Sequence, residues 1–315
     1  VSQFKGGQSN PTYKIEAGGE AYVLRRKPPG KLLPSAHAVD REYRVISALG
    51  QTDVPVPETF GLCEDADVIG TAFYIMSFAE GRIFWNPELP DQSRSERGEI
   101  FDAMNDVIAR LHKVDYAAVG LSEFGKPGNY FARQIGRWSK QYKASETESM
   151  PAMDKLIEWL PDNIPPGDDT SIVHGDYRLD NMVFHPTEPR VIAVLDWELS
   201  TLGNPLGDFS YHVMPWRVEP DLFRGLGGLD LKSMGIPTEE DYIAAYCRRV
   251  GRDGIGDWDF YMAYNMFRLS AIAQGIMGRV RDGTAASKHA IETTKLTKPL
   301  GELGWSHALN VINRS

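Results

Sequence analysis

The stretch "SIVHGDYRLDNMVFHP", residues 171–186, crowds charged and amide side chains between two apolar runs. Asp176 is followed five residues later by Asn181, and the next apolar run, "VIAVLD", ends in Asp196. Carboxylate and amide oxygens are ligands that Mg²⁺ takes alongside nucleotide phosphates. One of the acids would then remain free to accept a proton. This spacing predicts a phosphoryl-transfer site, in which an Asp orients the attacking hydroxyl and an Asn and a second Asp bind metal.

A plainer interpretation of the same residues is a turn, because Asn, Asp and Gly often connect two strands. The combined spacing of two acids and one amide favours the chemical interpretation. A metal site built from His174 and His185 fits the residue types alone, but Mg²⁺ prefers oxygen ligands. We therefore expect His174 to support the loop through hydrogen bonds.

The elements that must position these residues follow from periodicity. Residues 12–17 and 21–26 are rich in β-formers around "GG" at 18–19, which predicts a hairpin. Apolar residues at helical spacing predict a helix over 39–50, and residues 55–65 and 72–78 indicate two more strands. The first third of the chain is therefore expected to be strand-rich.

From about residue 92 the pattern becomes helical. Helices are predicted around 100–111, 129–144 and 151–160, followed by short strands at 171–174, 181–184 and 191–196 and further helices to the end. The simplest division is a β-rich N-terminal lobe, residues 1–77, and a helix-rich C-terminal lobe, residues 78–315. The polar cluster then lies at the mouth of a small hairpin in the second lobe.

The composition of the chain argues against several classes of binding partner. The 315 residues carry a formal charge of −9, and no basic run stands out, which argues against nucleic-acid binding. Cys63 and Cys247 lack the spacing of a disulfide framework or zinc site, which fits a reducing cytoplasm. No apolar run reaches the length of a membrane span. We expect a cytoplasmic protein without nucleic-acid or membrane partners that acts on a small molecule.

"HGDYRLDN" followed by "LDWE" resembles the aminoglycoside-phosphotransferase and choline-kinase group of the protein-kinase-like fold. The resemblance covers nearly the whole chain. It implies an α+β, bilobal protein-kinase-like fold, with a small antiparallel β-sheet in the N-lobe and a helix-rich C-lobe. It also implies ATP or GTP together with Mg²⁺ as cofactors, and a small-molecule hydroxyl as the acceptor.

Carried over by position, the resemblance makes Asp176 the catalytic base and Asn181 and Asp196 the metal ligands. Arg178 stands where protein kinases often keep a Lys that meets the transferring phosphoryl group, although a solvated loop Arg is the simpler alternative. Asp208, in "GNPLGDFSYH", corresponds to an acid that braces the catalytic loop.

On the nucleotide side, glycine and small polar residues in "KGGQSNPTY" let backbone N–H groups approach an anion. The resemblance places Arg25 at the phosphate-binding Lys position, with Glu42 as its partner, and Arg and Lys are not interchangeable there. It makes Met76 the gatekeeper before the hinge, residues 77–79, whose backbone would hydrogen-bond adenine. The remaining predicted nucleotide-binding residues are Gly7, Ser9, Asn10, Thr12, Ser77 and Ala79.

The acceptor is expected to bind to the helical lobe, where Trp216, Arg217 and Arg268 suit an anionic or partly apolar molecule. "VLRRKPPGKLLPSAHAVDREYRVISAL" and "GQSNPTY" look closest to the branch found fused to, or encoded near, acyl-CoA dehydrogenases. That branch implies a functional link to such a dehydrogenase and a hydroxyacyl-CoA-type acceptor. Two alternatives stay open: an aminoglycoside-type antibiotic kinase, and a nucleotide-binding regulatory module with weak catalysis.

Overall fold

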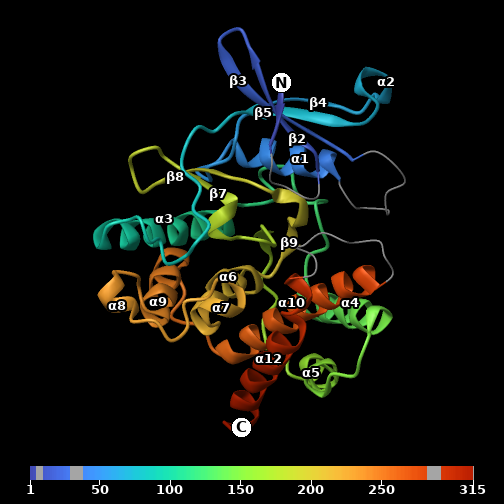
Figure 1. Ribbon diagram of the computed structural model, residues 1–315, viewed down its shortest axis with the longest axis vertical. Coiled ribbons are helices and arrows are strands. Elements are labelled where there is room, and N and C mark those ends of the chain that lie inside the picture. Colours follow the sequence, from blue (N-terminus) through green and yellow to red (C-terminus); the bar gives the residue numbers. More distant parts are fainter. Residues whose placement is uncertain (5–9, 29–37, 282–291, 315) are drawn as a thin grey trace. The chain divides into compact units, whose positions relative to one another are not determined.

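A computed structural model of the chain describes residues 1–4, 10–28, 38–281 and 292–314 (Figure 1). The chain forms two compact units. Unit 1 consists of Val1–Lys126 and Ser171–Leu202, and unit 2 of Pro127–Thr170 and Gly203–Ser315. The predicted division after residue 77 differs from this grouping, because a long helix and the hairpin that carries the polar cluster belong to the same unit as the N-terminal sheet. As a division into functional lobes it stays a prediction.

An antiparallel sheet of five strands, in the order β1-β2-β3-β5-β4, forms the N-terminal part of unit 1 (Figure 1). Its strands are β1 (Ser2–Gln3), β2 (Thr12–Ala17), β3 (Glu20–Arg26), β4 (Thr59–Cys63) and β5 (Phe73–Ser77). The β2–β3 turn uses Gly18 and Gly19, both at positive φ, as the tight hairpin requires. This hairpin lies where the sequence predicts it.

Helix α1 (Val39–Leu49) packs against β4 and β5. Val39, Val45, Ile46 and Leu49 are buried, and Glu42 lies among them with its carboxylate almost fully buried. A carboxylate inside an apolar face requires partners, because an unpaired buried charge is costly. A short helix, α2 (Ala66–Ile69), connects β4 to β5.

The rest of unit 1 is one long helix and two small sheets. Helix α3 (Arg94–Lys113) begins at Ser93, whose Oγ accepts a hydrogen bond from Glu96 N at 3.2 Å. Strand β6 (Ser171–Val173) pairs with β9 (Thr201–Gly203), and β7 (Met182–Phe184) pairs antiparallel with β8 (Val191–Val194). Single 3-10 turns, η1 (Leu179–Asn181) and η2 (Trp197–Leu199), adjoin the β7–β8 hairpin.

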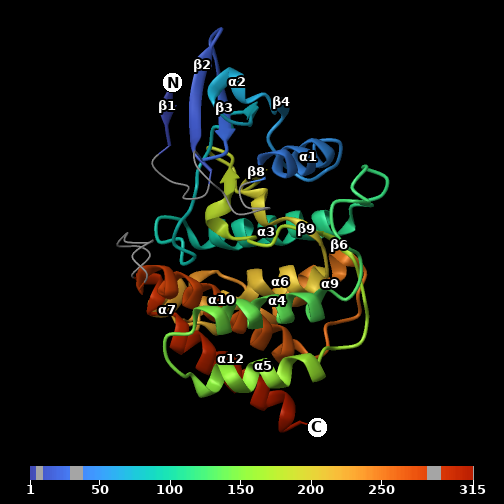
Figure 2. The ribbon, with the colours of Figure 1, turned by 90° about the vertical axis from the view of Figure 1, so that its right-hand side faces the viewer.

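Unit 2 is helical and centres on α10 (Trp258–Arg281), whose side chains are mostly buried. Helices α12 (Thr297–Ile312), α4 (Tyr130–Ser145), α6 (Pro205–Val213) and α5 (Pro151–Asp162) contact it (Figure 2). The remaining described elements are η3 (Met214–Arg217), α7 (Pro220–Phe223), α8 (Leu231–Met234) and α9 (Glu239–Val250). Within the described ranges, none of the helices is both long and apolar enough to cross a membrane.

Candidate active site

Arg25 on β3 joins two carboxylates that come from distant parts of unit 1. Its Nε lies 2.8 Å from Glu42 Oε2, on α1, and its Nη2 donates to Asp196 Oδ1, after β8, at 2.6 Å. The Arg25 side chain is 11% exposed. Burial alone would lower the pKa of Arg25, but the two carboxylates raise it above its ordinary value. The guanidinium is therefore a fixed positive charge at the point where these elements meet.

Glu42 is held by neutral donors as well as by Arg25. Asn10 Nδ2 donates to Oε1 at 2.7 Å, and the Tyr74 hydroxyl on β5 donates to Oε2 at 3.1 Å. Burial raises the pKa of Glu42 to about 7, while the nearby Arg25 charge lowers it. Burial also raises the pKa of the Tyr74 hydroxyl, so that this group stays a donor. The Arg25–Glu42 contact expected from the sequence is thus present, and its role in nucleotide binding stays a prediction.

The residues of the predicted catalytic loop contact each other directly. Asn181 Nδ2 donates to Asp176 Oδ2 at 3.1 Å and to the Asp176 carbonyl at 2.9 Å. The Arg178 Nε lies 3.1 Å from Asp176 Oδ1, and its Nη2 lies 3.4 Å from Asp180 Oδ2. Because the amide nitrogen of Asn181 faces Asp176, its oxygen is the atom left for a cation. Arg178 lies against the predicted base and does not extend freely into solvent.

His174 connects this loop to the segment that carries Asp196. Its Nδ1 accepts from Asp176 N at 3.2 Å, and its Nε2 lies 2.9 Å from the Leu195 carbonyl. A carbonyl can only accept, so the proton lies on Nε2, and the ring is neutral because Nδ1 is an acceptor. The ring is fully buried and packs against Trp197 at 4.6 Å between centroids. This geometry fits a supporting residue.

The β7–β8 hairpin brings Asn181 and Asp196 to the same end. Met182 pairs with Val194, and Leu195 N donates to Asn181 O at 2.8 Å, so each predicted metal ligand directly adjoins this pairing. Asp196 has φ 66° and ψ 57°, a left-handed conformation that a non-glycine residue adopts at some cost in free energy. Strained backbone of this kind is often found at functional sites.

The donor set fits Mg²⁺ that arrives with a nucleotide. In the described ranges, no three His, Cys, Asp or Glu side chains are grouped so that they could hold a metal ion by themselves. Mg²⁺ usually needs only one or two protein carboxylates, with phosphates and water completing its shell. Asp196 and the Asn181 amide oxygen supply such a partial set, although Arg25 contacts one Asp196 oxygen.

The predicted hinge follows Met76, the predicted gatekeeper, which is buried near the end of β5. Ser77 N donates to Glu58 O at 2.8 Å, and Phe78 N donates to Ala21 O at 3.3 Å. Both N–H groups are therefore used inside the sheet. Of the three predicted hinge residues, Ala79 is the one whose N–H remains for a nucleobase within the described chain.

The predicted phosphate loop lies largely outside the described residues, including Gly7 and Ser9. Asn10 is 1% exposed and turns toward Glu42, and Thr12 Oγ1 donates to the Asn10 carbonyl at 2.9 Å. Thr12 also pairs with Arg25 across β2 and β3. In this structure Asn10 positions the acidic partner of Arg25, and direct contact between Asn10 and phosphate stays a prediction.

Unit 2 holds the predicted acceptor residues, and each has an internal contact. Trp216 Nε1 donates to the Pro237 carbonyl at 2.9 Å, and Arg217 pairs with Glu239 at 2.5 Å. Arg268 is 8% exposed, and its guanidinium carbon lies 5.0 Å from the centre of the Tyr211 ring. Their role in acceptor binding stays a prediction.

Asp208 lies buried in the first turn of α6, in unit 2. Its predicted support of the catalytic loop likewise stays a prediction.

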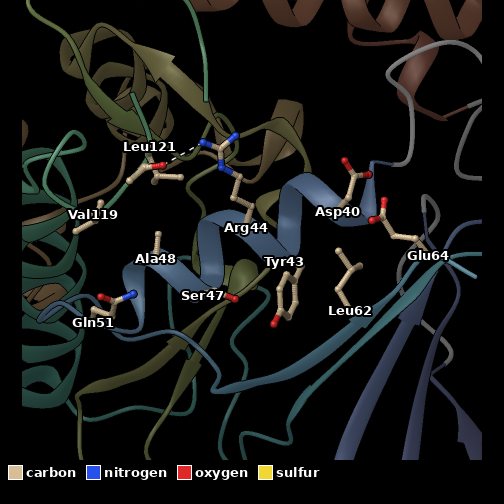
Figure 3. Close-up of a pocket in the computed structure, with 11 residues that line it drawn as sticks. Asp40, Tyr43, Arg44, Ser47, Ala48, Gln51, Leu62, Glu64, Val119 and Leu121 are labelled. Atoms are coloured by element: carbon tan, nitrogen blue, oxygen red, sulfur yellow. Dashed lines mark hydrogen bonds between the residues drawn. The ribbon is translucent and has the colours of Figure 1, made fainter. Parts of the chain in front are cut away.

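A pocket of about 520 Å³ lies along the outer face of α1 (Figure 3). Tyr43 and Leu62 line it, and Arg44 Nη2 donates to the Gly120 carbonyl at 3.0 Å beside it. Helical spacing puts Glu42 on the opposite side of α1 from Arg44. Within the part of the chain that is described, none of the predicted site residues lines this pocket.

Sequence reasoning missed two residues of this centre. Tyr74 lies in a strand and looks like an ordinary core aromatic, although its hydroxyl binds Glu42. Glu198 lies two residues beyond Asp196, with Oε2 3.9 Å from Arg25 Nη2. An acid in "LDWE" was a visible signal for Glu198, whereas only the three-dimensional packing reveals the role of Tyr74.

Residues 1–264 match a family described as "Phosphotransferase enzyme family". Curated relatives include acyl-CoA dehydrogenase family member 10 of Mus musculus, 48% identical over 97% of this chain and 29% of the relative. Acyl-CoA dehydrogenase family member 11 of Rattus norvegicus is 44% identical over 96% of this chain and 39% of the relative. The chain thus spans well under half the length of these relatives.

Solved structures show the same fold. A protein from Ralstonia eutropha jmp134, named as a candidate aminoglycoside phosphotransferase, superposes with a TM-score of 0.92 at 58% identity, over 98% of this chain and 92% of its own. The aminoglycoside phosphotransferase APH(4)-Ia, in complex with AMP-PNP and hygromycin B, superposes with a TM-score of 0.62 at 16% identity, over 97% of this chain and 92% of its own. At that identity the likeness concerns the fold alone.

These likenesses confirm the predicted α+β, protein-kinase-like fold class, and the curated relatives match the branch named from the sequence. The family match covers most of the chain, and the geometry of Arg25, Asp176 and Asp196 agrees with it. The chain belongs to the phosphotransferase enzyme family.

Proposed function

We propose that this protein transfers the γ-phosphoryl group of ATP to a hydroxyl of a small molecule, with Mg²⁺. The observation that carries the proposal is the Arg25 bridge from Glu42 to Asp196, at 2.8 and 2.6 Å, beside the Asp176–Asn181 pair. These contacts support the proposal, because a cation that could bind phosphate and carboxylates that could bind metal and accept a proton lie within unit 1. This is the set of groups that phosphoryl transfer uses.

In the proposed reaction the acceptor hydroxyl lies against Asp176. The hydroxyl oxygen forms a bond to the γ-phosphorus while the bond from that phosphorus to the β–γ bridging oxygen breaks, and its electron pair leaves with ADP. The hydroxyl proton passes to a carboxylate oxygen of Asp176. Asn181 orients that carboxylate through its amide hydrogen bond. Arg178, now 3.1 Å from Asp176, is placed to meet charge on the transferring group.

The nucleotide phosphates would be held from two sides. Asp196 and the Asn181 amide oxygen would bind Mg²⁺, which neutralises phosphate charge when it is bound. Arg25 would contact phosphate oxygens while Glu42 keeps its guanidinium in place. AMP-PNP in the complex of APH(4)-Ia supports an adenine nucleotide for this fold.

For the acceptor, we propose a hydroxyacyl-CoA-type metabolite. The support is indirect, because the curated relatives are named as acyl-CoA dehydrogenases and are more than twice as long as this chain. The same names support a functional link to an acyl-CoA dehydrogenase. Arginine and aromatic side chains of unit 2, such as Arg217 and Trp216, suit an anionic, partly apolar ligand.

The decisive experiment measures ADP release with panels of hydroxyacyl-CoAs, amino alcohols and aminoglycosides, each with ATP or GTP and with or without Mg²⁺. We expect turnover with a hydroxyacyl-CoA and Mg·ATP. The Asp176→Asn variant should lose turnover by at least about a hundredfold, as removal of a general base typically does, with little change in nucleotide affinity. Full turnover in this variant would refute the role of Asp176.

The screen also separates the alternatives. Turnover with an aminoglycoside alone would support an antibiotic kinase, which the name of the Ralstonia eutropha relative favours. Binding of Mg·ATP in a thermal-shift titration without ADP release from any acceptor would favour a regulatory module. Arg25 in place of Lys is the feature of this chain that motivates that last reading.

A further inference from the structure

Arg82, five residues after Ser77, contacts two other segments of unit 1, the turn of the β7–β8 hairpin and helix α3. Its Nε donates to the His185 carbonyl at 3.0 Å, and its Nη2 donates to the Glu188 carbonyl at 2.9 Å. Its Nη1 donates to Glu96 Oε1, in the first turn of α3, at 2.7 Å. Hydrogen bonds from a charged group are about twice as strong as neutral ones. One side chain thus fastens the turn of the β7–β8 hairpin to a long helix.

The backbone at this point is also bound to the hairpin. Arg82 N donates to Phe184 O, and Phe184 N donates to Arg82 O, both at 2.8 Å. Gly81 makes this approach possible, because a Cβ there would lie 2.1 Å from Phe184 O and 2.7 Å from a methyl carbon of Val183. The segment that contains Arg82 therefore meets β7 through a single antiparallel bridge, from Arg82 to Phe184.

The hairpin connects this attachment to the predicted metal ligands. Arg82 binds its turn end, at His185 and Glu188, while Asn181 and Asp196 adjoin its open end. The strands have three and four residues, so the two ends lie about 10 Å apart at the usual rise per residue. The two strands are joined by their antiparallel pairing, which has a register shift between Val183 and Phe184, and by the Leu195 N–Asn181 O hydrogen bond at the open end. This chain of bonds is the route by which a displacement of the turn would reach the open end.

We propose that Arg82 is a positioning residue that fixes the β7–β8 hairpin relative to the hinge, and so sets the distance between the nucleobase contacts and the metal-bound phosphates. The effect on ATP binding rests on the proposed function. The fixing of the hairpin by Arg82 rests on the observed contacts alone. ATP spans both subsites, so its affinity depends on their spacing, whereas adenosine occupies only the first.

The test compares Arg82→Ala with Arg190→Ala as a matched control. Arg190 also binds in the hairpin turn, with Nε 2.6 Å from Glu188 Oε2, but its side-chain contact stays within the turn. The first measurement is amide hydrogen exchange of Leu195, whose N–H closes the open end of the hairpin. We expect exchange to be at least about tenfold faster in Arg82→Ala, a change of about 1.4 kcal/mol, and unchanged in Arg190→Ala.

The second measurement is the ratio of the adenosine dissociation constant to that of Mg·ATP, at a temperature where each variant is folded. We expect this ratio to fall about tenfold in Arg82→Ala through weaker Mg·ATP binding, with adenosine affinity retained. A merely structural loss would lower the melting temperature without changing the ratio. Arg82→Lys keeps the charge opposite Glu96, so its ratio should lie between those of Arg82→Ala and the wild type.

The exchange and affinity measurements together decide whether the proposal holds. Faster exchange and a lower ratio in Arg82→Ala support the proposal. Unchanged Leu195 exchange, or an unchanged ratio in a variant that shows faster exchange, overturns it. If the wild-type protein binds neither adenosine nor Mg·ATP, the proposed function fails, and the exchange data alone then decide whether Arg82 fixes the hairpin.

Discussion

The Nη2 atom of Arg25 lies 2.6 Å from Oδ1 of Asp196, so the cation expected to bind phosphate is held by the carboxylate expected to bind metal. Arg25 also lies 2.8 Å from Glu42, which means that it pairs with a buried acid and a partly exposed acid at once. A metal ion that approaches Asp196 must compete with this guanidinium. Metal and nucleotide should therefore bind in a coupled way, because phosphate gives Arg25 a new partner when it leaves Asp196.

We therefore expect Arg25→Met to have opposite effects on two affinities. Binding of a divalent ion alone should tighten about tenfold, because the competing positive charge is gone, while Mg·ATP binding should weaken about tenfold through the lost phosphate contact. Titrations with Mn²⁺ alone and with Mg·ATP measure both. Arg26→Met is the control, because Arg26 neighbours Arg25 on β3 but lies over the Tyr13 ring. Weaker binding of both ligands by Arg25→Met would contradict the competition.

Glu42 predicts a specific dependence of stability on pH. Its pKa is raised from 4.5 to about 7 in the folded protein, chiefly by burial. The folded state then binds this proton more tightly than the unfolded state. Protonation of Glu42 therefore adds on the order of 3 kcal/mol to the free energy of unfolding below pH 4.5. This contribution is lost as the pH rises to about 7.

The Glu42→Gln variant should remove this contribution. Relative to it, the wild-type free energy of unfolding should fall between pH 5 and pH 8, as measured by urea unfolding at several pH values. Glu64→Gln, at an exposed acid just beyond β4, is the control and should run parallel to the wild type. A wild-type curve that rises over this range relative to Glu42→Gln would mean that the Arg25 charge outweighs burial.

Substitution of His174 tests whether its ring positions the predicted catalytic loop. His174→Phe keeps an aromatic ring against Trp197 but leaves the Asp176 N–H and the Leu195 carbonyl without their bonds. Loss of such buried bonds costs about 1–3 kcal/mol in the free energy of unfolding. We expect that loss in chemical denaturation, together with slower ADP release and nearly unchanged nucleotide affinity. Unaltered turnover in a folded His174→Phe would show that the ring has no positioning role.

Much of the architecture was accessible from the pattern of residues. The β2–β3 hairpin and α1 lie where alternation and helical spacing indicate, because local rules govern a two-glycine turn and an amphipathic helix. The helix expected from 100 begins earlier, at Arg94, since Ser93 caps it. The Arg25–Glu42 contact was reached through a family resemblance and not through spacing.

The remaining site residues depend on contacts between distant segments. Asn10 reads as a loop residue in "QSNP", yet it is buried against Glu42, 32 positions away. From the sequence Arg82 looks like a solvated cation, but in the structure it donates to the carbonyls of His185 and Glu188. No periodic pattern encodes such contacts, because they arise when packed elements bring separate loops together.

The hinge yields the sharpest test of nucleobase binding. Ser77 N and Phe78 N already donate within the sheet, which leaves Ala79 as the predicted donor among the three. Ala79→Pro removes one N–H, so ATP and adenosine should both bind about tenfold more weakly, the cost of one hydrogen bond. Ala79→Gly keeps the N–H and serves as the control for the altered side chain. Equal affinities in the proline variant and the wild type, measured by calorimetric titration, would place the nucleobase contact elsewhere, because a base held at Ala79 cannot lose its donor without cost.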